Sequence, residues 1–293
     1  MASPTTQEWL AGLYEPAILL STAAYHFFIV ALESIFKKGQ FFPPISKLRD
    51  DSFSRFWLKF SASRDPDSST TPEQQQEALT GSSALIPPIL SLSTGIVLDI
   101  GPGSGTQIPY FPKTSSIRTV YGAEPCKPLH AELQKRINEE GWEGKYRIVH
   151  CSAEEESLVP ELGKVGLLSS NKEEGVFDSI VCTRVLCSVP RPEETIGGLY
   201  KLLKPGGKML VCEHVVNPWG TRKGSLLARG VQGLYTWLGW SFFMGDCHMN
   251  RDTGRYLRDV AKGDGGWESV ELDSHFGWST LPYISGVLVK KST

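Results

Sequence analysis

Three glycines alternate behind an acidic residue in the stretch LDIGPGSGT, a composition typical of a ligand-binding turn. Glycines let the backbone turn sharply and bring its N–H groups, at the start of a helix, close to a ligand. Dinucleotide-binding turns have the spacing G-x-G-x-x-G, whereas this one has G-x-G-x-G. An acid two positions before it would repel a pyrophosphate but suits a ligand that carries an ammonium and a sulfonium. We therefore predict that Asp99, Gly101, Pro102, Gly103 and Gly105 bind S-adenosylmethionine rather than NAD.

Further polar residues stand where the following β-branched runs end. Glu124 comes roughly 20 residues after the first glycine, where an acid accepts both hydroxyls of a ribose. After the third run, a backbone N–H and an acid or amide can read the edge of an adenine. We assign to the same cofactor site Glu124, Pro125, Ser152, Ala153, Glu154, Thr183 and Arg184.

Three residues are candidates for the chemical step. His214 follows Glu213 at the end of the fifth run, where ligands bind in open α/β sheets, and an imidazole can deprotonate a thiol or hydroxyl. A structural histidine is the competing interpretation. Asp246, Cys247 and His248 lie between two aromatic-rich stretches and are expected to face the same cleft, with Asp246 and His248 as the candidates for the chemical step.

The pattern around these residues alternates short β-branched runs with helical stretches, which is typical of a parallel sheet covered on both faces. Helices are expected over Pro128 to Glu140 and Pro192 to Leu203, and the last two strands are close enough to form an antiparallel hairpin. The predicted strands are Ile96 to Ile100, Ile117 to Ala123, Tyr146 to His150, Val176 to Thr183, Lys208 to His214, Trp267 to Leu272 and Ile284 to Lys290.

This order of motifs resembles that of class I S-adenosylmethionine-dependent methyltransferases, which implies a Rossmann-like α/β fold with a seven-stranded sheet. The stretches VCTRVLCSV, LKPGGKMLVCEHV, GDCHMNRDTGRYL and LPYISGVLVK are similar to those of the methyltransferase-like thiol methyltransferases, membrane-associated enzymes of animals, and of their fungal relatives. The resemblance covers roughly Gly95 to Lys290. Pro102 stands where a cysteine is commoner in that family, and the N-terminal segment is longer.

The N-terminal segment is apolar from Pro16 to Leu32 and is followed by Lys37 and Lys38. Its length is at the lower limit for crossing a bilayer, so three interpretations stay open: a helix lying in a membrane interface through residues 16–38, a helix packed over the active site, and a spanning anchor. We expect the protein on the cytoplasmic side of an internal membrane, with a soluble cytoplasmic protein as the alternative. A second helix, around Asp51 to Phe60, is amphipathic.

The predicted layout is an N-terminal helical extension over residues 1–60, a polar linker over 61–71 and a methyltransferase domain over 72–293. A helix capped by Thr71, with Pro72 at its first position, is expected to open that domain. An insertion over 217–250 is expected to cover the acceptor. Its stretch Leu226 to Phe243 is apolar and aromatic, and can form core, a wall of the acceptor pocket or a membrane-facing lid. As a pocket wall it would imply an apolar acceptor.

Composition excludes several classes of function. The formal net charge of −2 argues against a nucleic-acid partner, which would require a strongly basic face. The six cysteines are never paired as C-x-x-C, so we expect free thiols in a reducing compartment and neither a metal site nor disulfides.

The expected reaction is methylation of a thiol or hydroxyl of a lipophilic small molecule, with thiol first on the strength of the resemblance and secondary metabolism as a setting. The main alternative is a cofactor-binding scaffold that catalyses a cyclisation or rearrangement without methyl transfer. A protein or nucleic-acid methyltransferase is less favoured because no Asn/Asp-Pro-Pro-aromatic motif follows the fourth run. A non-catalytic lipid-binding protein is the least favoured class.

Overall fold

The computed structural model describes residues 4–62, 79–168 and 175–292. From residue 63 on, the predicted linker lies outside the described residues, as does the predicted start of the helix capped by Thr71. The first two residues of that linker, Ser61 and Ala62, belong to a helix instead.

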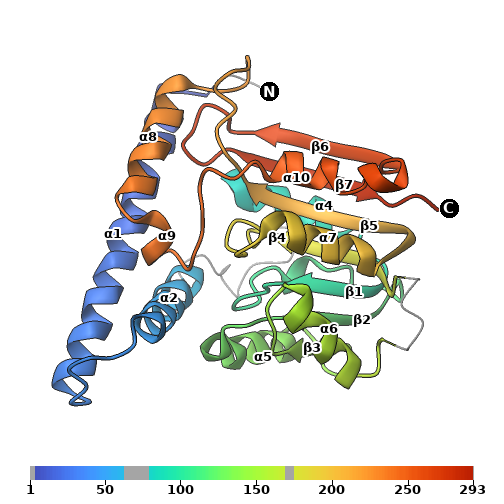
Figure 1. Cartoon of the computed structure of the whole chain (residues 1–293), viewed down its shortest axis with the longest axis horizontal. Helices are drawn as coiled ribbons and strands as arrows, with labels where there is room; N and C mark the ends of the chain where they lie inside the picture. The colour runs from blue at the N-terminus through green and yellow to red at the C-terminus, as the bar shows by residue number, and fades with distance from the viewer. Residues whose placement is uncertain (1–3, 63–78, 169–174, 293) are drawn as a thin grey trace. The chain divides into compact units, whose positions relative to one another are not determined.

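A seven-stranded sheet forms the centre of the fold, with strand order β3-β2-β1-β4-β5-β7-β6 (Figure 1). The first five strands run parallel, and Asp99 on β1 lies opposite Gly122 on β2 and Val181 on β4. The strands are β1 (Gly95–Ile100), β2 (Ile117–Ala123), β3 (Tyr146–Val149), β4 (Phe177–Thr183), β5 (Leu203–His214), β6 (Ser269–His275) and β7 (Tyr283–Val289).

Strand β7 runs antiparallel to both of its neighbours, β5 and β6, and makes the sheet mixed. Gly206 donates its N–H to Lys290 O at 3.0 Å and Val215 donates to Pro282 O at 2.9 Å, so residue numbers rise along β5 as they fall along β7. Glu268 N–H donates to Val289 O at the start of β6. The seven-stranded α/β sheet with a final antiparallel pair, predicted from the sequence, is confirmed.

Burial follows this topology. The ends of β1, β2, β4 and β5 are runs of consecutive buried residues, because neighbouring side chains on opposite faces of a central parallel strand are both covered. Strand β6 lies at the edge of the sheet and has no buried residue. The carboxyl ends of β1 to β5 therefore meet at one well-buried edge, where the predicted site residues fall.

The chain forms two compact units. The sheet unit holds residues 64–213, 253–273 and 284–293, and the helical unit holds residues 1–63, 214–252 and 274–283. Within the sheet unit, the α-helices among the described residues are α4 (Ile86–Leu90), α5 (His130–Glu139), α6 (Glu155–Lys164), α7 (Pro192–Leu202) and α10 (Thr253–Asp259). A 3₁₀ helix, η1 (Gly81–Leu85), precedes α4, and another, η3 (Lys127–Leu129), forms the first turn of the helix expected from Pro128.

The helical unit contains α1 (Thr6–Phe36), α2 (Ile45–Ala62), α8 (Leu226–Trp237) and α9 (Trp240–Phe243). Helix α1 packs against the other three, which places the predicted insertion with the N-terminal helices rather than with the sheet. The physical reason is that α1 is apolar on all sides, so the apolar residues of α8 and α9 can bury surface against it.

Helix α1 is longer than the apolar run predicted. A capping box extends it to Thr6, since Thr5 Oγ1 accepts from Glu8 N–H and the Glu8 carboxylate accepts from Thr5 N–H. Pro16 lies inside the helix and has no N–H to donate to Gly12 O. The N–H and hydroxyl of Thr280 donate to that carbonyl at 3.0 and 2.8 Å, so the β6–β7 loop replaces the missing bond.

By length and composition α1 could cross a membrane, and 28% of its most apolar window is buried. One face, including Leu20, Ala23 and Val30, is buried within the protein. Seven of the residues left exposed are also large and apolar: Leu10, Tyr14, Ile18, Tyr25, Phe28, Leu32 and Phe36.

Candidate active site

Asp99, the predicted acid of the glycine turn, lies in a fully buried polar cluster. Its carboxylate accepts the Tyr146 hydroxyl at 2.8 Å and the Gln107 side-chain amide at 3.3 and 3.4 Å. Tyr146 lies on β3 and reaches across β2 to β1 because Gly122 has no side chain: a Cβ there would lie 2.5 Å from the Tyr146 hydroxyl. Asp99 is thus held by the protein's own groups at the base of the turn.

Burial raises the pKa of Asp99 to about 7, against the opposing hydrogen bonds from Tyr146 and Gln107. The unfolded chain keeps a carboxyl pKa near 3.8. The folded form therefore binds this proton more tightly than the unfolded chain does. The contribution of Asp99 to the free energy of unfolding falls as pH rises from about 4 to about 7.

Asp99→Asn removes this titration while preserving size. We expect the stability of the variant, relative to the natural chain, to increase as pH rises across that interval, because only the natural chain loses its favourable protonated form. Urea unfolding without cofactor at several pH values measures the difference. Parallel stability curves would show that Asp99 does not titrate in this range.

Glu124 ties the end of β2 to the glycine turn. It is 4% exposed, and its carboxylate accepts Gly103 N–H and Cys126 N–H, each at 2.7 Å. Burial raises the pKa of Glu124 against these two bonds. Each carboxylate oxygen has a second lone pair, so it can also accept from a ribose hydroxyl. Pro125, next in sequence, is exposed and its carbonyl accepts from the His150 ring.

The glycine turn requires glycines at its contacts. Gly101, Gly103 and Gly105 have φ values of 60°, 61° and 80°, in the left-handed region that strains other residues. A Cβ at Gly101 would also lie 2.5 Å from Val185 Cγ2 in the loop after β4. Pro102 is buried in the same turn. The N–H groups of these three glycines already donate to Ala123 O, Glu124 Oε2 and Pro102 O. The turn therefore allows a ligand to come close to a backbone without side chains, next to the remaining lone pairs of the Glu124 carboxylate, which fit the ribose of the predicted cofactor.

Glu213 is a functional candidate that the sequence analysis did not assign. It is fully buried at the end of β5, and its Oε1 accepts the N–H groups of Val185 and Leu186 at 2.8 and 2.9 Å. It therefore fixes the loop that contacts Gly101. The signal for this role was its position directly before His214 at a strand end.

Arg184 has a backbone φ of 57°, which is uncommon outside glycine. Its Nη2 donates to the hydroxyls of Ser82 and Ser83 at 3.0 and 3.1 Å, which ties η1 to the end of β4. Thr183, before it, is buried. The Arg184 guanidinium thus anchors the segment before β1. Its contact with the cofactor stays a prediction.

The residues after β3 form the start of α6. Ser152 N–H donates to Ser157 Oγ at 3.1 Å, so this amide is already used within the loop. Ala153 is buried, and Glu154 is the N-cap residue of α6.

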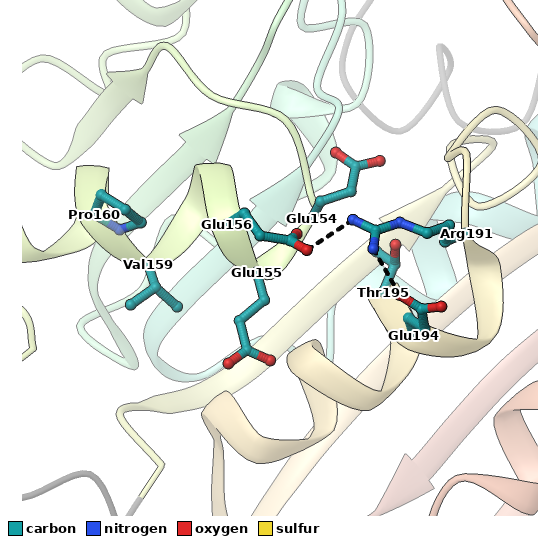
Figure 2. Close-up of a pocket in the computed structure, with 8 residues that line it drawn as sticks. All are labelled: Glu154, Glu155, Glu156, Val159, Pro160, Arg191, Glu194 and Thr195. Carbon is teal, nitrogen blue, oxygen red and sulfur yellow. Dashed lines mark hydrogen bonds and ion pairs between the residues drawn. The ribbon is translucent and has the colours of Figure 1, made fainter.

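Glu154 also lines an open groove of about 480 Å³ between α6 and α7 (Figure 2). Arg191 lies in this groove and pairs with Glu156 and Glu194, each at 2.8 Å (Figure 2). Glu155 also lines the groove and pairs with Lys201, which is not part of the lining. The charged lining does not suit an apolar acceptor.

His214 is the last residue of β5 and is 5% exposed. Its Nε2 lies 3.1 Å from Cys247 Sγ, and its ring contacts Tyr283 edge-on. The sequence analysis placed Cys247 in a segment expected to face the cleft but gave it no part in the chemical step. No local signal could have shown the contact, because 33 residues separate it from His214.

The two other predicted catalytic residues do not join this pair. Asp246 is exposed, with φ 59°, and forms an ion pair with Arg49, whose guanidinium also donates to Ser241 O and Phe242 O. This arrangement tethers the end of α9 to α2. His248 is half-buried, and burial together with Arg251 lowers its pKa. Cys247, rather than Asp246, is the residue of this segment that lies against His214.

The parallel sheet and the glycine turn beside Glu124 define a class I S-adenosylmethionine-dependent methyltransferase. The chain belongs to the family described as methyltransferase domain, whose model matches residues 72–270. S-adenosylmethionine is accordingly its cofactor.

Relatives at the sequence level include two proteins named thiol S-methyltransferase TMT1B. The rat protein is 32% identical over 39% of this chain and 44% of its own length, so the match spans less than half of that relative. The mouse protein is 25% identical over 66% of this chain and 70% of its own length. An O-methyltransferase family protein from Burkholderia thailandensis has a similar fold, with TM-score 0.51 and 14% identity over 96% of this chain and 72% of that one.

Proposed function

We propose that this methyltransferase transfers the methyl group to the thiol, or in second place the hydroxyl, of a lipophilic small molecule. One observation carries the proposal: His214, the candidate base, belongs to the same compact unit as the apolar helices α1, α8 and α9. The names of the two mammalian relatives support thiol as the first choice.

The cofactor supplies a methyl group on a sulfonium, and the protein has to orient the acceptor and remove its proton. Glu124 and the glycine turn would hold the cofactor. In-line transfer depends mostly on positioning, so the part left for a base is to remove the acceptor's proton. His214 would take the proton from the acceptor's S–H or O–H, and the sulfur or oxygen would form a bond to the methyl carbon as the bond between that carbon and the sulfonium sulfur breaks, which leaves S-adenosylhomocysteine.

The test is an incubation of purified full-length chain with labelled S-adenosylmethionine and matched acceptors. Long-chain and short-chain thiols are compared with phenols and alcohols of equal length. The proposal expects label on the thiol products first, with higher kcat/KM for the longer chain. Label on neither thiols nor hydroxyls, with the cofactor bound, would favour the alternative of a non-methylating scaffold.

We further propose that the helical unit lies on a membrane surface, on the cytoplasmic side of an internal membrane. The apolar face of α1 that the protein leaves exposed includes Phe28 and Phe36, the latter 81% exposed, and Trp237 on α8 is 80% exposed. Large exposed apolar patches mark membrane or protein contacts. Lys37 and Lys38 follow this face and can meet anionic headgroups.

The triple variant Phe28→Ser, Phe36→Ser, Trp237→Ser is expected to bind anionic lipid vesicles much more weakly, since it removes exposed apolar area and leaves the core intact. Flotation of vesicles with the full-length protein measures this. The matched control is Leu92→Ser, Val165→Ser, Val270→Ser, which changes exposed apolar residues of the sheet unit. Equal flotation of both variants and the natural chain would contradict the membrane proposal.

A further inference from the structure

Two histidines hold the loop that follows Glu124 at the end of β2. His130 Nε2 lies 2.8 Å from Glu124 O, and His150 Nε2 lies 3.1 Å from Pro125 O. A carbonyl oxygen only accepts hydrogen bonds, so both Nε2 atoms carry a hydrogen and donate it. The two rings meet edge-on, with centroids 5.2 Å apart and planes at 84°, so each ring restricts the rotation of the other. Two consecutive carbonyls of one loop are therefore held by one pair of imidazoles.

The proline in this loop explains why side chains have to hold it. The peptide group between Glu124 and Pro125 has no N–H, so its carbonyl oxygen is its one polar handle. His130 donates to that oxygen. The next peptide group is held at both ends, since His150 donates to its oxygen and its N–H, on Cys126, donates to Glu124 Oε1. Side chains thus fix the backbone at the point where the strand ends.

Each histidine stands where its element can reach the loop. His130 is the first residue of α5, and side chains of a helix lean toward its N-terminus, so the ring reaches a carbonyl six residues earlier. His150 directly follows β3, which pairs with β2, and it precedes Ser152, which is predicted to read the adenine. These residues all belong to the sheet unit. The pair therefore joins α5 and the loop after β3 to the residue predicted to hold the ribose.

We propose that His130, supported by His150, is a positioning residue for the cofactor: it fixes the backbone of Glu124 so that the carboxylate faces the ribose hydroxyls. This inference rests on the proposed role of Glu124 in holding the cofactor. The Glu124 N–H donates to Val149 O at 3.0 Å and its carboxylate accepts two loop N–H groups, so with His130 all its polar groups have partners. The remaining lone pairs of the carboxylate then have a fixed direction, which lowers the cost of ordering the site when the ligand binds.

The two imidazoles also favour the charged form of Glu124. Burial raises the pKa of this carboxyl, while its hydrogen bonds to the loop and the charge on His130 and His150 oppose the rise. An ionised carboxylate accepts at both oxygens, whereas a protonated one would present an O–H to the ribose. When Nδ1 of either ring takes a proton, Nε2 keeps its hydrogen, so the bonds to the loop persist in the charged form.

The test is calorimetric titration of the full-length chain with S-adenosylhomocysteine and with the analogue that lacks both ribose hydroxyls. The natural chain should bind the analogue roughly 100-fold more weakly, because two hydrogen bonds to a carboxylate are missing. His130→Ala should bind S-adenosylhomocysteine about 10-fold more weakly than the natural chain does, while its affinity for the analogue changes by less than about 3-fold. A general loosening of the sheet unit would instead weaken both ligands alike.

His130→Gln is the matched variant, because a side-chain amide can donate from about the place of Nε2, and it should recover most of the affinity. Gln134→Ala removes an exposed side chain of α5 that bonds to Asn138 on the same helix, so it should bind both ligands as the natural chain does. His150→Ala removes an exposed donor with a longer bond, so a loss of about 3-fold is expected. It tests the pair even if His130→Ala does not fold.

The preference of the natural chain for the ribose hydroxyls decides how the variants are interpreted. Where that preference is present, equal losses for both ligands in folded His130→Ala, or unchanged affinity, would overturn the inference. If the natural chain binds both ligands alike, the proposed contact of Glu124 with the ribose fails. A loss in His130→Ala that His130→Gln restores would in that case still support His130 as a positioning residue of the cofactor loop.

Discussion

Glu124→Ala is expected to lose measurable affinity for S-adenosylhomocysteine while the chain stays folded. The variant removes the carboxylate that accepts Gly103 N–H and Cys126 N–H, and with it the proposed acceptor of the ribose hydroxyls. A hydrogen bond to a charged group contributes about 1.5 to 3 kcal/mol, so losing two ligand bonds would weaken binding by roughly 100-fold or more. Calorimetric titration of the purified protein measures the loss.

Two further variants separate the ligand contact from the support of the turn. Glu124→Gln keeps the shape but places an amide N–H₂ against one of the two backbone donors, so it should also weaken binding. Glu143→Ala removes an exposed acid elsewhere on the sheet unit and serves as the control. Circular dichroism and urea unfolding check the fold. Natural affinity in Glu124→Ala would show that the cofactor is held by other residues.

The parallel sheet could be predicted from the sequence because its strands are short apolar runs separated by helical periodicity. The second strand was predicted at its observed bounds, Ile117–Ala123. The fifth was predicted to begin at Lys208 but begins at Leu203, because Leu203 pairs with Phe177 on β4 and Gly206 bonds to Lys290 in a register that only the folded sheet defines. The local sequence pattern predicts whether a segment is a helix or a strand better than it predicts the residues at which that element begins and ends.

The candidate site was predictable where residues share one strand end and less so where they meet through distant packing. The proximity of Glu124 and the glycine turn follows from two neighbouring parallel strands. The burial of Asp99 under Tyr146 depends on the missing side chain of Gly122, a cross-strand contact with no local signature. The pairing of His214 with Cys247, and of Asp246 with Arg49, depends on how α9 packs within the helical unit.

His214→Ala is expected to lower turnover by about 10²- to 10⁴-fold, the usual contribution of a general base, while affinity for the cofactor barely changes. Turnover and cofactor affinity should respond differently because Glu124 and the glycine turn, which are proposed to hold the cofactor, belong to the sheet unit, whereas His214 belongs to the helical unit. Steady-state kinetics with a thiol acceptor, together with titration of S-adenosylhomocysteine, measures the two quantities separately.

The dependence on pH and acceptor distinguishes a base from a structural histidine. A free thiol has a pKa of about 8.5, so at high pH the acceptor ionises by itself. The factor by which His214→Ala lowers turnover should then become smaller. An alcohol does not ionise in this range, so with an alcohol acceptor the factor by which His214→Ala lowers turnover should not change with pH. His248→Ala is the comparison, and a loss equal to that of His214→Ala would place the proton transfer on a wider group of residues. A constant loss with both acceptors at every pH would indicate that His214 supports the packing around Cys247 and does not take the proton.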